Sequence, residues 1–168
     1  MEINGVVISG SSPTIIASSS TDGIVVVGTT TETISRSFLI PANTFKISGQ
    51  LEIFVRMTKT GNLGTSTLKM YKNTSNALAG STLIGVFASN LAGTSTYVQG
   101  GRTARIVSNT LSIFPTNAIF AFDYTYNANP LTSTTFTTSV DNYIIFSIQL
   151  GSTSDSANVS MSRLIKYE

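Results

Sequence analysis

Cysteine, histidine and tryptophan are all absent from this chain of 168 residues. The absence of cysteine excludes a disulfide framework, a thiolate metal site and a cysteine nucleophile. The absence of histidine removes the commonest metal ligand and the commonest general base. The sequence also lacks a glycine-rich phosphate motif, a nucleophile elbow and a dinucleotide fingerprint. We therefore expect a protein that is not an enzyme and that carries no cofactor and no metal.

Charged residues are scarce as well, at 11% of the chain. Hydroxyl side chains supply the missing polarity, since the chain has 24 serines and 25 threonines. The formal net charge is +2, and the lysines and arginines are scattered from Arg36 to Lys166 without forming a run. A protein that binds nucleic acid concentrates such charges on one face, so we expect no nucleic-acid partner.

Long hydrophobic runs are the third absence. No apolar stretch approaches the roughly 18 residues that a membrane-spanning helix needs. Glu2 stands where a secretory leader would carry a basic residue, and no leader-like apolar region follows it. The sequence therefore predicts no membrane insertion and a protein that stays soluble in the cell that makes it.

Strand patterns fill most of the chain. The clearest strand alternates apolar with mostly polar residues, and its apolar members are Leu51, Ile53, Val55 and Met57. This period of two predicts a half-buried strand. The run from Asn142 to Leu150 is almost continuously apolar, which predicts a strand that is buried on both faces.

About ten short strands are expected, with turn residues between them and no long helix. They fall at residues 31–40, 50–59, 65–73, 82–88, 95–102, 104–108, 110–114, 118–126, 142–150 and 159–167. The pattern predicts an all-β fold, an antiparallel jelly-roll-like β-sandwich of about 8–10 strands. Gly100 and Gly101 predict a bulge or a sharp bend. The longest irregular segment expected is Asn127–Asp141.

The N-terminal region differs from the rest because its apolar runs are short and flexible links separate them. One interpretation is that these runs are extra strands of the sandwich. The other is an arm that adds strands to the exposed edge of a neighbouring subunit or of an anchoring protein. We divide the chain into residues 1–28, a β-rich arm or attachment segment, and residues 29–168, the sandwich domain.

Candidate contact residues come from two places in the sequence. The first is a mixed cationic and aromatic cluster formed by Tyr97, Gln99, Arg102 and Arg105. It has the chemistry to grip an acidic sugar or a phosphate, although a solvated sheet face or a contact between subunits is the more common reason for such a cluster. The second is Tyr124 with Tyr126, which the alternation assigns to the core or a subunit interface, with an open ligand surface as the alternative.

Carboxylates give one further candidate. Asp123 and Asp141 flank the long irregular segment and form the only pair that the expected fold brings together easily. A glycosidase needs two carboxylates that face each other across a cleft. The simpler interpretation, which we prefer, is that Asp141 caps a turn and Asp123 lies on a solvated face.

Three stretches of the chain read SFLIPANTFKISGQLEIFVRMTKTGN, STLKMYKNTSNALAGSTLIGVF and DNYIIFSIQLGSTSDSANV. They resemble a β-sandwich domain in virion appendage proteins of tailed bacteriophages. The matching features are the turn at Ile40–Phe45, the alternating strand with central Arg56, and the loop at Asn73–Ser75. The resemblance covers residues 29–160 and contains no catalytic signature.

The resemblance implies a virion structural protein, a small trimeric jelly-roll knob of a head or tail fibre that contacts the host cell surface. Such a protein assembles in the host cytoplasm, becomes part of the virion, and takes an anchoring virion protein and a host surface glycan as expected partners. A stand-alone carbohydrate-binding module is the alternative, with Tyr97, Tyr124 and Tyr126 as its platform. A small icosahedral coat protein is less favoured, because no lysine or arginine precedes Arg36.

Overall fold

A computed structural model describes residues 2–3, 6–7, 12–45, 48–61, 64–89, 95–113 and 132–168. These residues form strands and loops, and no helix capable of crossing a membrane occurs among them. The strands are β1 (Glu2–Ile3), β2 (Val6–Val7), β3 (Thr14–Ser19), β4 (Val26–Val27), β5 (Thr33–Ile40), β6 (Ser48–Thr60), β7 (Ser66–Asn73), β8 (Thr82–Ser89), β9 (Ser95–Val107), β10 (Thr110–Ile113), β11 (Thr132–Thr135), β12 (Asn142–Gln149) and β13 (Ser156–Tyr167).

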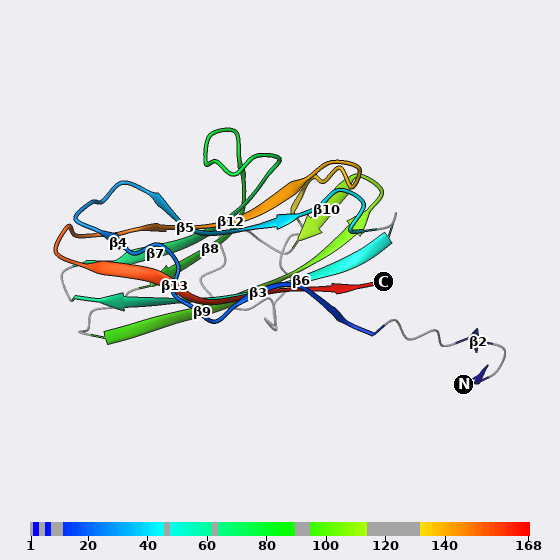
Figure 1. The fold of residues 1–168 in the computed structure, drawn as a ribbon, viewed down its shortest axis with the longest axis horizontal. Coiled ribbons are helices and arrows are strands. Elements are labelled where there is room, and N and C mark those ends of the chain that lie inside the picture. Colours follow the sequence, from blue (N-terminus) through cyan, green and yellow to red (C-terminus); the bar gives the residue numbers. More distant parts are fainter. Residues whose placement is uncertain are drawn as a thin grey trace.

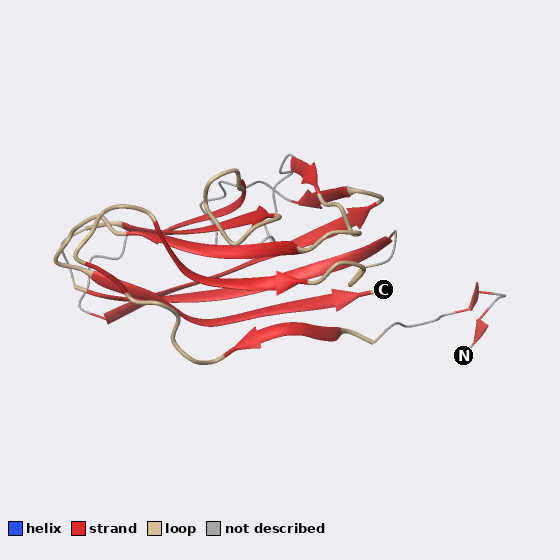
Figure 2. Cartoon of the chain, turned by 45° about the horizontal axis from the view of Figure 1, so that its top comes forward, coloured by secondary structure: helices blue, strands red, loops and turns tan. Residues whose placement is uncertain are grey.

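Two antiparallel sheets pack face to face, as Figures 1 and 2 show. Among the described residues, a seven-stranded sheet has the order β11-β10-β9-β6-β13-β3, with β4 also paired to β13. A four-stranded sheet has the order β5-β12-β7-β8, and β1 pairs with β2 alone. The expected all-β sandwich is confirmed.

The connectivity is that of a jelly roll. Eight strands, β3, β5, β6, β7, β8, β9, β12 and β13, make up the two facing sheets. The first of these pairs with the last, the second with the seventh, the third with the sixth and the fourth with the fifth. This is a long antiparallel hairpin wrapped into two layers. Strands β10 and β11 extend one edge, beyond β9.

The core lies between the two sheets and follows the alternation of the sequence. The expected inward residues of β6 are all fully buried. Strand β12 is buried on both faces, as predicted, because it runs through the middle of the four-stranded sheet. Phe146 on this strand meets Phe38 of β5 edge to face, with ring centroids 6.2 Å apart. Such aromatic contacts add to the burial of apolar area that holds the two layers together.

Two expectations about local structure are wrong. Gly100 and Gly101 do not interrupt a strand, because β9 pairs with β6 from Ser95 to Val107 without a register shift. The segment Asn127–Asp141 is not wholly irregular either, since it contains β11. Its threonines were expected to form a loop, but they find backbone partners along β10, and Phe136 after them is buried. The strand expected at 118–126 lies outside the described residues.

The N-terminal region supplies strands to the seven-stranded sheet. Strand β3 pairs with β13, and β4 pairs with Ser156 and Ala157 at the start of β13. The interpretation of these runs as extra strands of the sandwich is therefore confirmed for β3 and β4. The expected division at residue 28 and a docking role for residues 1–28 both stay predictions.

Candidate functional site

The candidate residues on β9 point to opposite faces of the seven-stranded sheet. Tyr97, Gln99 and Arg105 share the outer face, which points away from the core, and Tyr97 is 60% exposed. Arg102 is 1% exposed and lies between the sheets, with its guanidinium carbon 4.5 Å from the centre of the Phe87 ring. Alternation along a strand separates even from odd positions, so these four residues do not form one cluster.

Arg56 takes the place beside Tyr97 that the sequence assigned to Arg102. Strand β6 lies next to β9, with Arg56 directly opposite Gln99. Its guanidinium carbon lies 4.8 Å from the centre of the Tyr97 ring. This distance is within the range of a cation–π contact. The outer face therefore carries an aromatic and cationic group, built from a different arginine.

The remaining sequence candidates divide between described and undescribed parts of the chain. Tyr124, Tyr126 and Asp123 lie outside the described residues. Asp141 accepts a hydrogen bond from the backbone N–H of Ala42 at 2.8 Å. It therefore caps the turn after β5, as expected for Asp141, while the position expected for Asp123 stays a prediction.

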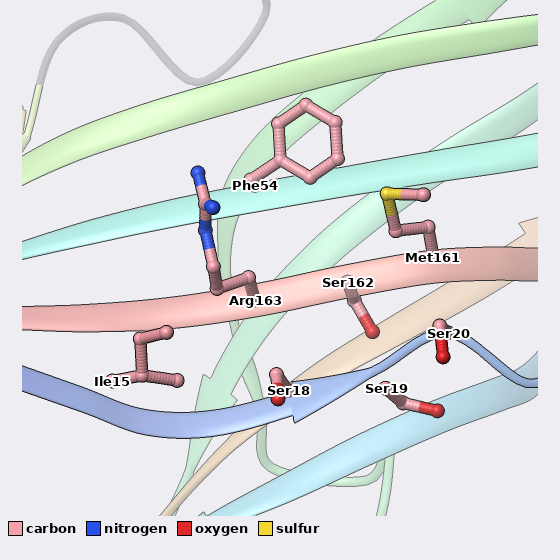
Figure 3. A pocket seen from close by; sticks show the side chains of 8 residues that line it. All are labelled: Ile15, Ser18, Ser19, Ser20, Phe54, Met161, Ser162 and Arg163. Carbon is pink, nitrogen blue, oxygen red and sulfur yellow. The ribbon is translucent and has the colours of Figure 1, made fainter.

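A groove on the outer face lies along β3 and β13 (Figure 3) and has a volume of about 340 Å³. Its lining residues are Ile15, Ser18, Ser19, Ser20, Phe54, Met161, Ser162 and Arg163. Arg163 faces Phe54 across the β13–β6 pair, with 5.8 Å between its guanidinium carbon and the ring centre. Ile15 and Met161 are 59% and 38% exposed. The groove therefore combines a cation, hydroxyl groups and exposed apolar surface.

Sequence reasoning missed this groove for a physical reason. In the structure, Met161 and Arg163 lie on one face of β13, two residues apart. The groove also requires β3, which comes from the other end of the chain, and Phe54 of β6. The register between these three strands depends on pairing over more than a hundred residues, and no local pattern reports it.

A buried ion pair lies at the end of β6. Lys59 and Asp155 are fully buried, and Nζ of Lys59 lies 2.9 Å from Oδ2 of Asp155. Lys59 also donates a hydrogen bond to the carbonyl of Gly61 at 3.1 Å. Gly61 has a φ of 99°, and a Cβ there would collide with the Asp155 carboxylate. This turn therefore requires glycine, and the ion pair locks it to the loop before β13.

A second polar cluster lies over the four-stranded sheet. Glu32 accepts hydrogen bonds from Lys69 at 2.7 Å and from Ser147 at 2.6 Å. Burial acts to raise the pKa of Glu32, but these hydrogen bonds, a further one from Tyr71 and the charge of Lys69 together lower the pKa below its ordinary value. Burial and the neighbouring Glu32 raise the pKa of Tyr71. The cluster ties the segment before β5 to β7 and β12.

The lowered pKa predicts how stability depends on pH. A carboxyl group with a lowered folded-state pKa stabilises the fold above its unfolded-state value, here about 4.5, and this contribution is lost as the pH falls through the folded-state value. We expect the unfolding free energy of a Glu32→Gln variant to fall less steeply below pH 4.5 than that of the parent. Urea unfolding of both proteins between neutral and acidic pH measures this. Parallel curves would contradict the role of Glu32.

Metal ligands do not gather in the described part of the chain, where no group of three or more carboxylates lies close enough to hold an ion. A scan against protein-family models found no match. A search of curated proteins found none either.

A search of solved structures found a likeness to a chain in "Structure of infectious bursal disease virus Gx strain". The identity is 9% and the TM-score is 0.35. The match covers 99% of the present chain and 46% of the viral one, so this chain spans less than half of that protein. A likeness of this degree says nothing about what the present chain does.

Proposed function

We propose that this chain is a structural protein of a bacteriophage virion, the subunit of a small homotrimeric head- or tail-fibre component. The resemblance of residues 29–160 to virion appendage domains supports this proposal. The jelly-roll topology supports it as well, because two sheets offer outer faces that can be buried between subunits. Under this proposal the protein is part of the virion and contacts the host cell surface.

One observation supports a contact between subunits. Ile24, Val25 and Val27 are 66%, 55% and 61% exposed, while Val26 between them is buried. Their backbone is held in place, because the N–H of Ile24 donates to the carbonyl of Ser35 at 2.8 Å and β4 pairs with β13. A fixed segment that presents three aliphatic side chains to solvent is typical of a surface that another protein covers. We call Ile24, Val25 and Val27 the aliphatic edge.

The solution mass tests the proposal. We expect size exclusion with light scattering to give a mass near three times 17.8 kDa. A variant with Ile24→Ser, Val25→Ser and Val27→Ser is expected to run as a folded monomer, because each change removes apolar area from the contact. The matched control is Leu39→Ser, an exposed residue of β5, which is expected to leave the trimer intact. A monomeric parent protein would overturn the proposal.

An anchoring virion protein is the further partner, docked through the N-terminal segment. Strand β3 belongs to the seven-stranded sheet, so removing residues 1–28 would also remove a strand of the sandwich. A truncation that separates docking from folding therefore ends before Thr14.

A stand-alone carbohydrate-binding module is the second candidate function. The observation that favours it is the exposed Tyr97 ring with Arg56 over one face. A monomeric protein that binds sugars on a glycan array, and that loses this binding when Tyr97 is replaced, would favour this alternative over the virion subunit.

A further inference from the structure

We propose that the groove along β3 and β13 is a binding site for a carboxylate-bearing sugar, with Arg163 as the residue that recognises the carboxylate. The inference concerns a different surface from the aliphatic edge. It therefore stands whether the protein is a trimer or a monomer.

Arg163 provides the charge. Its side chain is exposed, and among the described residues no carboxylate forms an ion pair with it. The contact with Phe54 orients the guanidinium on the outer face. The planar guanidinium fork matches a carboxylate, which can accept two parallel hydrogen bonds from it. An anionic ligand therefore meets an arginine that is already oriented and that forms no ion pair within the described part of the chain.

Hydroxyl groups line the side of the groove formed by the end of β3. Ser18 and Ser20 are exposed there, and Ser18 lies directly opposite Arg163 of β13. Ser162 does not contribute a hydroxyl to the groove, because it is 1% exposed and lies between Met161 and Arg163, which face outward. The hydroxyls of Ser18 and Ser20 are therefore the ones that a ligand in the groove can reach. Serine hydroxyls both donate and accept, as the hydroxyls of a sugar do.

Apolar surface completes the match. Ile15 and Met161 expose large side chains on the same face as Arg163. A sugar ring has a C–H face that packs on such surface, whereas a free inorganic anion has none. The volume of about 340 Å³ lies at the lower end of small-molecule sites, which suits one or two sugar units. Charge, hydroxyls and apolar surface together therefore favour an acidic sugar over a simple ion.

Titration of the full chain tests the site. The probes are methyl glucuronide, the neutral methyl glucoside, glucose 6-phosphate and inorganic phosphate. Two-dimensional amide NMR spectra record the binding of each probe. We expect saturable shifts of the residues around the groove with the glucuronide, with a dissociation constant in roughly the millimolar range. Arg163→Gln is expected to weaken this binding about tenfold or more, and Arg163→Lys to weaken it less.

The matched control is Lys166→Gln. Lys166 lies on the same strand but on the opposite face, where it pairs with Glu168 at 3.1 Å. The Lys166→Gln change removes one positive charge from β13, as Arg163→Gln does, and we expect it to leave glucuronide binding unchanged. Equal loss in both variants would reduce the effect to net charge and overturn the assignment to Arg163.

Each remaining outcome also bears on the proposal. Equal binding of the glucoside and the glucuronide would overturn the role of the carboxylate, as would binding of glucose 6-phosphate alone. Binding of inorganic phosphate as tight as that of the sugars would overturn the role of the sugar ring. Absence of saturable shifts with every probe would overturn the site itself, while the solution mass would still report on the virion subunit.

Discussion

Replacing Asp155 with leucine is expected to lower the free energy of unfolding by about 3–5 kcal/mol, because the change leaves the Lys59 ammonium buried without its carboxylate. Both side chains are fully buried, so water cannot solvate the remaining charge. The turn at Gly61 is expected to loosen as well, because it packs directly against Asp155. Urea unfolding at neutral pH measures the loss.

The double variant Lys59→Met with Asp155→Leu separates the ion pair from the packing around it. Replacing both partners of a buried pair by apolar residues is often neutral or stabilising, so we expect it to regain most of the lost stability. Lys69→Met is the second control. It breaks the partly exposed pair with Glu32, and we expect it to cost about 1 kcal/mol or less. A double variant no more stable than Asp155→Leu would contradict this account.

Replacing Arg102 with alanine is expected to cost about 2–4 kcal/mol, because the change empties the space that a fully buried side chain fills. It also removes the stacking of the guanidinium on Phe87 between the sheets. Replacing Arg105 on the same strand is the matched control. Arg105 is exposed on the outer face, and its change to alanine is expected to alter stability by about 0.5 kcal/mol at most.

This comparison decides between two roles for the arginines of β9. A large loss of stability for Arg102→Ala, with sugar binding unchanged where the protein remains folded, assigns Arg102 to the core. Equal small effects of both changes on stability would contradict the buried position of Arg102. Thermal unfolding followed by circular dichroism is sufficient, because the expected difference corresponds to several degrees in Tm.

The error over Arg102 has a simple geometric origin. Even a bulge at Gly100 and Gly101, which would move Arg102 to the side of Gln99, would leave Arg105 on the opposite side. Continuous pairing with β6 keeps the period of two across both glycines, so Arg102 turns inward. Grouping four residues that are close in sequence ignored this alternation and assigned a core residue to the surface. Arg56 was missed because its contact with Tyr97 depends on the alignment of β6 against β9.

The fold class was predictable because it depends on local chemistry. Alternation in β6 and the continuous apolar run of β12 report which side chains avoid water, and burial in the structure follows both patterns. The turn at Pro41, the strand at Thr33–Ile40 and the cap by Asp141 also follow from short-range rules. These features need no knowledge of which strand lies next to which.

The sequence by itself therefore determined the all-β class, the positions of most strands and the inward face of β6, since all of these depend on neighbours along the chain. Only the tertiary structure decided that β3 closes the seven-stranded sheet beside β13, that Lys59 meets Asp155, and that Arg163 and Phe54 form a groove with the serines of β3. The reason is the antiparallel wrapping of the jelly roll, which pairs the first strand with the last. Register over that separation depends on the packing of the whole sandwich, because side chains on both sheets must be buried together.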